Sequence, residues 1–281
     1  MKKLCTCFLA FVLLAGCSQQ TGNELKEDGS SDALQQIIVG ASPSPHAVIL
    51  NEIKDDLKEK GYELVIKEFD DYVIPNTALD GGELDANYFQ HEPYLLTFNV
   101  DHDTHISNVL KVHFEPLGIY AGKDHEAKDS FGLDDLSDGA VIAVPNDATN
   151  RGRALQLLDS QGVITLKEGV DVDSVTVLDI VENPKNIEIQ EIEAKMIPTF
   201  LPDVDYAVIN GNYALSAGIT DKVCVAESKE SEGAQKYANI LAVKEGNEES
   251  DKTKALIEAL TSDEVKAFIE EEFDGLVVPV F

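Results

Sequence analysis

Short apolar runs alternate with helical patterns along almost all of this 281-residue chain, and this alternation limits the possible folds more than any other feature. The first unit is an apolar run at residues 37–40, a helical pattern that closes at Gly61, and a second apolar run at residues 62–69. Ser44 is the expected N-cap of the helix, with Pro45 at its first position. A strand–helix–strand unit of this kind predicts parallel strands.

The same alternation continues to the C-terminus. Further strand-like runs fall at residues 86–89, 109–114, 117–120, 141–144, 175–181, 187–192, 206–209 and 237–243, and further helical patterns at residues 133–136, 150–158, 214–218, 252–260 and 262–273. Pro75 and Pro93 each suit a helix start, and Ser262 is a good N-cap. The pattern predicts an α/β protein of two doubly wound lobes, with a ligand cleft where strand ends meet.

The lobe boundaries are expected at changes in composition. The charged stretch at residues 123–129 is the expected first crossing between the lobes. We therefore assign residues 36–121 and 222–281 to lobe 1, so that the C-terminal part returns to it, and residues 122–221 to lobe 2.

The N-terminus has the pattern of a secretion signal. Two lysines precede an apolar run that is too short to span a membrane, so residues 1–16 read as a signal peptide. The run ends Leu-Ala-Gly-Cys17, which resembles the bacterial lipobox and implies that Cys17 is lipidated; ordinary cleavage with an unmodified Cys17 is the alternative. Residues 17–35 are polar and small, typical of a flexible tether. Cys224 is then the one cysteine left in the folded part, and we interpret it as an inert thiol.

The net charge of −30 limits the possible partners. It argues against nucleic acid and against docking on an anionic membrane surface, so the lipid is the expected membrane anchor. It also disfavours strongly anionic ligands, whereas a zwitterion, which is neutral overall, feels little of this repulsion.

The only two arginines, Arg151 and Arg153, lie together in residues 145–158. An apolar run precedes them and a helical pattern follows, with Thr149 or Asn150 as the expected N-cap. A strand, a polar turn and a helix N-terminus form a natural anion site, and an arginine fork can hold a carboxylate. We therefore predict that one arginine binds a ligand carboxylate; the alternative is that both are surface charges.

Aromatic side chains are concentrated in one segment. Tyr72, Tyr88, Phe89, His91 and Tyr94 fall within 23 residues of a chain that has no tryptophan. Rings at strand ends beside proline turns can build an apolar pocket with polar tips. The alternative is that these rings fill the core.

Four long motifs carry a resemblance to a known family. They are Phe-Asp-Asp-Tyr-Val-Ile-Pro-Asn at residues 69–76, Asp-Ala-Asn-Tyr-Phe-Gln-His-Glu-Pro-Tyr-Leu at 85–95, Pro-Asn-Asp-Ala-Thr-Asn-Arg-Gly-Arg-Ala-Leu at 145–155, and Ala-Val-Ile-Asn-Gly-Asn-Tyr-Ala at 207–214. Together with the lipobox, they resemble the MetQ/NlpA family of methionine-binding lipoproteins, the solute-binding subunits of ABC importers. The resemblance implies a periplasmic-binding-protein type II clamshell that captures methionine, most simply L-methionine.

The resemblance also implies roles for single residues. Tyr72, Phe89, His91 and Tyr94 would surround the thioether, and Arg153 would hold the α-carboxylate. Asn150, Asn210 and Asn239 would bond the polar end of the amino acid, whereas Arg151 is expected at the surface. The Asn239 assignment is the loosest, because the preceding stretch, residues 224–236, looks longer than usual for the family. The implied partners are the permease and ATPase subunits of a methionine importer, on the extracytoplasmic face of the cell membrane, and no cofactor is expected.

Two other functions, a hydrolase and a metal site, are suggested by other residues. Ser42, Ser44 and His46 could suggest a hydrolase, but the chain has no Gly-x-Ser-x-Gly elbow, so we expect no enzyme activity. His102 and His105, with Asp101, Asp103 and the nearby His113, have spacings that a metal could use; the alternative is a solvated acidic loop.

Two questions about the ligand and its setting stay open. D-methionine, a methionine-containing dipeptide or another apolar amino acid could occupy the same pocket. An adhesive role as a surface lipoprotein is a further alternative, and the sequence does not distinguish a one-membrane from a two-membrane host.

Overall fold

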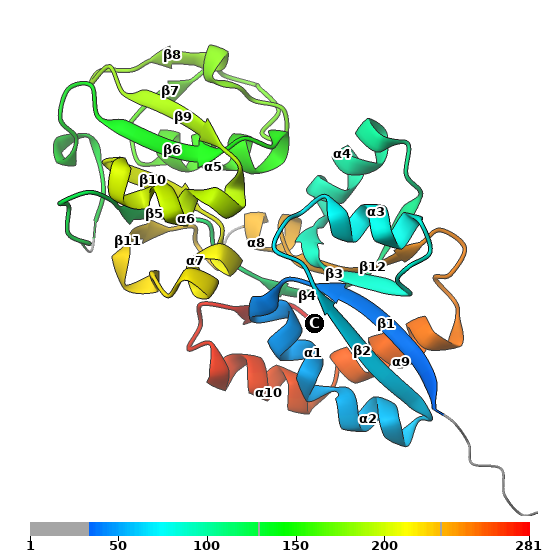
Figure 1. The fold of residues 1–281 in the computed structure, drawn as a ribbon. Coiled ribbons are helices and arrows are strands. Elements are labelled where there is room, and N and C mark those ends of the chain that lie inside the picture. Colours follow the sequence, from blue (N-terminus) through cyan, green and yellow to red (C-terminus); the bar gives the residue numbers. More distant parts are fainter. Residues whose placement is uncertain (1–33, 129, 231) are drawn as a thin grey trace, which may run out of the picture. The chain divides into compact units, whose positions relative to one another are not determined.

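The computed structural model describes residues 34–128, 130–230 and 232–281, and its strands form two large sheets (Figure 1). The predicted signal peptide, the lipidation site Cys17 and the predicted tether up to residue 33 lie outside the described residues. Gln35, which we expected in the tether, is the first residue of β1 (Gln35–Ala41). Among the described helices, none has the length and apolar character that a membrane-spanning segment requires.

The first sheet has six strands in the order β13-β4-β12-β3-β1-β2. They are β1, β2 (Tyr62–Glu68), β3 (Ala86–His91), β4 (Ile106–Phe114), β12 (Asn239–Lys244) and β13 (Val278–Pro279). β1 pairs in parallel with β2 and β3, which confirms the parallel opening unit, whereas β12 runs antiparallel to β3 and β4. The presence of β12 and β13 confirms that the C-terminal part returns to this sheet.

Short helices connect the strands of this sheet. They are η1 (Pro43–Ala47), α1 (Val48–Glu52), α2 (Lys54–Glu59), α3 (Ile74–Asp80), α4 (Glu92–His102), α9 (Asp251–Leu260) and α10 (Asp263–Glu272). Pro75 and Pro93 lie in the first turns of α3 and α4, as predicted. The Ser262 side chain accepts a hydrogen bond from the Val265 N–H, which confirms it as an N-cap.

The predicted cap at Ser44 is wrong. The N-cap position falls on Ser42, no side chain caps the helix, and Ser44 has an extended backbone with φ −139° and ψ 140°. The reason is Pro45, whose ring disfavours the helical region for the residue before it. The single helix expected between residues 44 and 61 is also divided at Ile53 into α1 and α2.

The second sheet has five strands in the order β11-β5-β10-β6-β9. They are β5 (Gly118–Ala121), β6 (Val141–Pro145), β9 (Glu188–Ile192), β10 (Tyr206–Ile209) and β11 (Val223–Ala226), and β7 (Thr165–Leu166) pairs separately with β8 (Ile180–Glu182). The helices of this part are η2 (Leu133–Asp135), α5 (Ala148–Ser160), η3 (Val177–Asp179), η4 (Ala194–Met196), α6 (Ile197–Phe200), η5 (Leu201–Asp203), α7 (Gly211–Ala217) and η6 (Thr220–Lys222). β6 runs parallel to β9 and β10, whereas β5 runs antiparallel to β10 and β11.

The chain changes sheets at different places from those expected. β4 belongs to the first sheet and β5 to the second, so the first crossing is residues 115–117 and not residues 123–129. β11 also belongs to the second sheet, so the return lies between β11 and β12, a segment that contains α8 (Glu232–Lys236). The expected boundaries at 121/122 and 221/222 therefore assign both strands to the wrong sheet. A charged stretch indicates exposure to water, which is not the same as a change of sheet.

The two largest apolar clusters lie one on each sheet. The first includes Ile37, Leu57, Tyr88, Leu256 and Ile269, and the second includes Ile119, Ile142, Leu155, Leu158 and Val208. Burial of these side chains stabilises each half by roughly 25 cal/mol for every Å² of apolar surface removed from water. Two cores agree with the two-lobed organisation that the sequence predicts.

Candidate ligand-binding site

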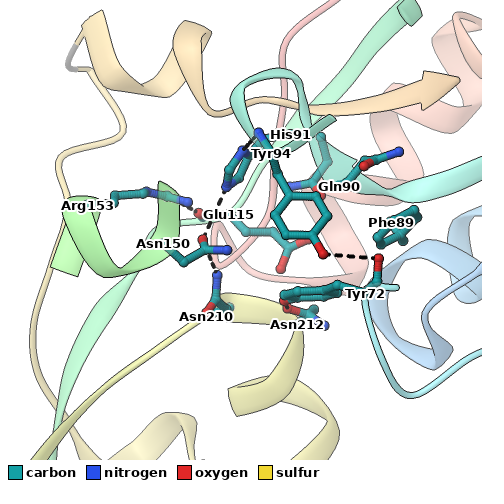
Figure 2. A pocket seen from close by; sticks show the side chains of 12 residues that line it. Tyr72, Phe89, Gln90, His91, Tyr94, Glu115, Asn150, Arg153, Asn210 and Asn212 are labelled. Carbon is teal, nitrogen blue, oxygen red and sulfur yellow. Dashed lines mark hydrogen bonds between the residues drawn. The ribbon is translucent and has the colours of Figure 1, made fainter. Parts of the chain in front are cut away.

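A pocket with about 350 Å³ of space, part of it open to solvent, is lined by residues of β3 and β12, of α4 and α5, of the start of α7, of the loop before α3 and of the first crossing (Figure 2). All eight predicted ligand-binding residues line it: Tyr72, Phe89, His91, Tyr94, Asn150, Arg153, Asn210 and Asn239. The remaining lining residues are Gln90, Glu115, Gly211 and Asn212, which the sequence analysis did not assign.

Aromatic rings form one side of the pocket. The Tyr72 ring lies 5.9 Å from Phe89 and 5.7 Å from Tyr94 between centroids, which is within the range of favourable ring pairs. Hydrogen bonds hold the rings in place: the Tyr72 hydroxyl donates to Asn212 Oδ1 at 2.7 Å, and the Tyr94 hydroxyl donates to the Tyr72 carbonyl at 3.2 Å. The result is an apolar surface with fixed polar edges.

Tyr88 is not part of this surface. It precedes Phe89 on β3, and successive side chains of a strand point to opposite faces. Its ring is fully buried in the first core, and its hydroxyl donates to His113 Nδ1. For this residue alone among the predicted aromatic cluster, the core-filling alternative is correct.

A chain of hydrogen bonds joins the two sheets beside the rings. His91 is the N-cap of α4, and its Nδ1 accepts from the Tyr94 N–H at 3.2 Å. Its Nε2 donates to Asn150 Oδ1 at 3.1 Å, and the Asn210 side-chain amide donates to the same oxygen at 2.8 Å. Burial, and then the Arg153 charge, lower the pKa of His91 to about 3. His91 is therefore a neutral donor at physiological pH.

The start of α5 differs in detail from the expected one. The N-cap is Asp147, whose Oδ1 accepts from the Asn150 N–H at 3.0 Å, so the predicted caps Thr149 and Asn150 lie inside the helix. Asp147 Oδ1 and Oδ2 also accept from the Asn150 side-chain amide, at 3.0 and 3.1 Å. The cap thus fixes the orientation of Asn150. The predicted cap lies two or three residues too late because the side chains of Thr149 and Asn150 also suit an N-cap position.

Gly152 brings α5 close to its neighbours. A Cβ at this position would lie 1.7 Å from the Val172 carbonyl oxygen, so only glycine allows the helix to pack there. This close approach sets the depth at which Asn150 and Arg153 enter the pocket.

Arg153 is a buried arginine, 4% exposed, with most of its donors already used. Its Nε donates to Glu227 Oε1 at 2.8 Å and its Nη2 donates to Glu227 Oε2, which is the bidentate geometry expected of a guanidinium and a carboxylate. Nη2 also donates to the Glu115 carbonyl at 3.0 Å, and the Tyr237 ring lies 4.5 Å from the guanidinium carbon. Nη1 makes no hydrogen bond to a described residue.

Arg151 is less exposed than expected. Its side chain is 16% exposed, and its Nη1 lies 3.2 Å from Glu191 Oε2. Its Nε donates to the Val175 carbonyl at 3.3 Å. Arg151 does not line the pocket, so the two arginines have separate roles although they are two positions apart. Side chains at i and i+2 of a helix do not face the same way.

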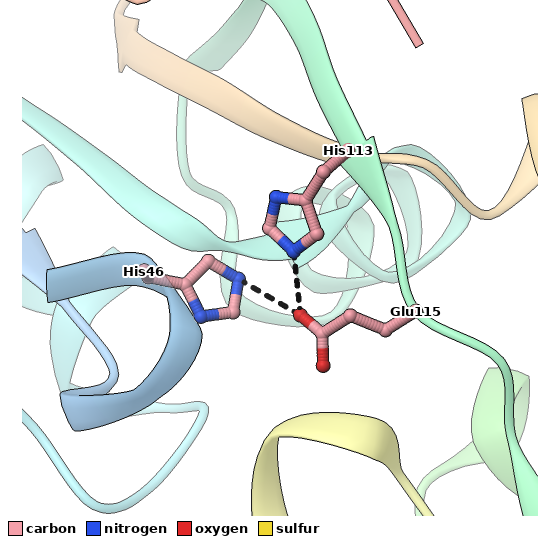
Figure 3. A group of neighbouring side chains, drawn as sticks. All are labelled: His46, His113 and Glu115. Carbon is pink, nitrogen blue, oxygen red and sulfur yellow. Dashed lines mark hydrogen bonds and ion pairs between the residues drawn. The ribbon is translucent and has the colours of Figure 1, made fainter. Parts of the chain in front are cut away.

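Glu115, in the first crossing, joins the pocket to a buried histidine pair (Figure 3). Its Oε1 accepts from His113 Nε2 at 2.7 Å and lies 3.4 Å from His46 Nε2, which also donates to Asn239 Oδ1 at 3.0 Å. Burial lowers the pKa of His46 to about 4 and that of His113 to about 3, and it raises the pKa of Glu115. In the described part of the chain, these three residues are the one group spaced to hold a metal ion.

The metal residues proposed from sequence are not brought together. The His102 ring stacks on Phe98 at 4.2 Å, whereas His113 is buried on β4 and contacts Glu115.

The hydrolase residues do not form a catalytic pair either. No hydrogen bond links Ser42 or Ser44 to His46, which instead bonds Asn239.

Sequence reasoning missed four lining residues for different reasons. Asn212 was inside a quoted motif, two positions after Asn210, and could have been included. Glu115 carried a usable signal, since it is a lone acidic residue between two apolar runs. Gln90 and Gly211 carried none: Gln90 lies between the assigned Phe89 and His91, Gly211 follows the assigned Asn210, and each resembles a spacer.

Two sheets with separate cores and one buried pocket lined from both define a two-lobed solute-binding protein. The model of the family described as NlpA lipoprotein matches residues 37–281 of the chain. The chain belongs to this family.

Relatives and solved structures agree with this assignment. The chain is 40% identical to the methionine-binding lipoprotein MetQ of Bacillus subtilis over 100% of this chain and 99% of that protein. It is 38% identical to the D-methionine-binding lipoprotein MetQ of Escherichia coli over 93% and 91% of the two chains. Among solved structures, a nutrient-binding protein from Burkholderia cenocepacia bound to methionine has a TM-score of 0.80 and 42% identity, covering 87% of this chain and 100% of that one.

Proposed function

We propose that this protein captures methionine in the pocket between its two sheets and delivers it to an ABC importer in the same membrane. The observation that carries the proposal is the composition of the pocket. Fixed aromatic rings line one side, and a buried arginine with buried amides lines the other. The names of the related binding proteins, and the methionine bound in one related structure, support the same ligand.

Each half of the pocket suits one half of the ligand. The Tyr72, Phe89 and Tyr94 rings contact the thioether, and each sulfur–aromatic contact contributes roughly 0.3–1.5 kcal/mol. His91 lies between the two halves, where it supports the Tyr94 backbone and Asn150 at once.

Arg153 holds the carboxylate through Nη1 and not through its bidentate fork. The fork is occupied by Glu227, which leaves Nη1 as the donor that faces no protein partner. Asn210 and Asn239 bond the polar end of the ligand. Asn150 acts mainly by positioning, since His91, Asn210 and Asp147 already use its side-chain amide.

Delivery requires a membrane location. We propose that Cys17 carries the lipid that holds the protein at the extracytoplasmic face, where it meets the permease and ATPase subunits of the importer. The protein acts by binding and release and changes no bond of the ligand.

The direct test is to identify what the protein carries and what it binds. The full-length chain is purified in detergent, denatured, and its released small molecules are identified by mass spectrometry. Calorimetry then compares L-methionine, D-methionine and glycyl-methionine. We expect methionine at about one molecule per chain, as a single tight site predicts. A protein that carries no amino acid and gives no heat with any of the three ligands would refute the proposal.

A further inference from the structure

The carboxylate of Glu115 is buried beside the pocket without a fixed positive partner. Glu115 is 5% exposed and lines the pocket. Its ion-pair contacts are to the two imidazoles, His46 and His113, and the Asn212 backbone N–H donates to it. Among the described residues, no lysine or arginine side chain forms an ion pair with it.

The groups around this carboxylate do not neutralise its charge. His46 and His113 are fully buried, and their low pKa values keep them neutral at physiological pH. The nearest guanidinium, that of Arg153, forms its ion pair with Glu227 and donates to the Glu115 backbone carbonyl. Its charge lowers the pKa of Glu115, but burial outweighs it and the pKa is raised. A buried carboxylate without a counter-ion is costly, so this position favours the arrival of a cation.

Further hydrogen-bond acceptors face the same pocket. Asn210 is 7% exposed, and its buried Oδ1 has no hydrogen-bond partner among the described residues, since its amide nitrogen is the group that bonds Asn150. Asn239 Oδ1 also belongs to the lining and accepts only from His46. A primary ammonium has three donors and no acceptor, which matches one carboxylate and two amide oxygens.

We infer that Glu115 receives the α-ammonium group of the ligand, with Asn210 and Asn239 as its two further acceptors, and that the site therefore selects amino acids whose amino group is free and charged. This inference rests on the proposed function and narrows its ligand class. The ligand carboxylate lies at Arg153 Nη1, so the zwitterion bridges two protein charges of opposite sign. Gly211 makes room for the arrangement, because a Cβ there would lie 2.9 Å from Glu115 Oε2.

The first experiment changes the ligand and leaves the protein intact. Calorimetry on the full-length wild-type chain compares L-methionine with its 2-hydroxy analogue, in which a hydroxyl replaces the ammonium, and with N-acetyl-methionine. We expect both analogues to bind at least about 30-fold more weakly, which is the size of a lost hydrogen bond to a charged group. Equal affinity for methionine and the hydroxy analogue would overturn the inference without any variant.

The second experiment changes the carboxylate. In Glu115→Gln, we expect methionine to bind at least about 30-fold more weakly while the hydroxy analogue binds as it does to the wild type, so the preference for the ammonium shrinks. Glu191→Gln, which removes a carboxylate outside the pocket, should keep the wild-type preference. Circular dichroism checks that each variant is folded.

The outcomes separate the inference from the proposed function. If Glu115→Gln weakens both ligands by the same factor, or leaves methionine binding unchanged, Glu115 is a structural residue and the inference fails while the proposed function stands. If the wild type carries no amino acid and binds neither L-methionine, D-methionine nor glycyl-methionine, the proposed function fails and the inference fails with it. If Glu115→Gln does not fold, the ligand comparison on the wild type still decides.

Discussion

At the scale of single residues, the site depends on which donors and acceptors are already in use. The chain has two arginines on the same helix, and both are paired with a carboxylate. Of the two, only Arg153 lines the pocket, and its Nη1 has no hydrogen-bond partner among the described residues. The two arginines are therefore a natural matched pair for testing what the pocket requires.

We expect Arg153→Ala to weaken methionine binding by about 100-fold, or about 2.7 kcal/mol, because the carboxylate loses its charged donor and Glu227 loses its partner. Arg151→Ala should change the affinity by less than about threefold, since its contacts are to Glu191 and Val175. Calorimetry on both variants measures the difference. Similar affinities for the two variants would contradict the role given to Arg153.

At the scale of elements, the position of α5 is set by one close backbone approach. The helix carries Asn150 and Arg153 into the pocket, and its cap Asp147 holds the side chain of Asn150. Gly152 lets this helix pack against the Val172 carbonyl. Any shift of α5 therefore moves the arginine and the amide together.

We expect Gly152→Ala to destabilise the protein by about 1–3 kcal/mol, the usual cost of overpacking, and to weaken methionine binding as well. Gly132→Ala is the matched control, because an added Cβ there meets nothing closer than the Gln161 carbonyl at 3.7 Å. Urea unfolding gives the stability and calorimetry the affinity. A Gly152→Ala protein with wild-type stability would show that α5 can move without cost.

At the scale of the whole molecule, buried histidines make stability depend on pH. Burial lowers the pKa of His46 to about 4, and those of His91 and His113 to about 3, against about 6.5 in an unfolded chain. Below pH 6.5 the unfolded chain binds protons that the folded chain does not, so acid favours unfolding. Glu115 acts in the opposite direction, because burial raises its pKa and the folded chain holds its proton at a higher pH.

We expect the free energy of unfolding to fall as the pH decreases from about 6.5 toward 4, by up to about 1.4 kcal/mol per pH unit for each buried histidine, less the Glu115 contribution. Urea unfolding of the ligand-free protein at pH 7, 6 and 5 measures the slope. His113→Gln should reduce the slope, whereas His105→Gln, at an exposed position, should keep it. A stability that is constant across this range would contradict the neutral, buried state of the histidines.

The sequence by itself determined the class of fold, the order of most elements and eight of the twelve residues that line the pocket. Periodicity and helix-start residues depend on neighbours in the chain, so the opening β-α-β unit, the starts of α3 and α4 and the cap at Ser262 were predictable. Seven of the eight assigned residues fall in the four motifs and Asn239 lies outside them, and all eight line one pocket. The lipid anchor at Cys17 stays a prediction, since it lies outside the described residues.

Only the tertiary structure decided where the chain changes sheets and which polar atoms remain free. Sheet membership depends on hydrogen bonds between distant strands, so β5 and β11 belong to the second sheet although local composition suggested otherwise. The pairing of Arg153 with Glu227 joins residues 74 positions apart, and the contact of Glu115 with His46 joins two different elements. Local patterns carry no information on such contacts, because they exist only when two remote segments are packed together.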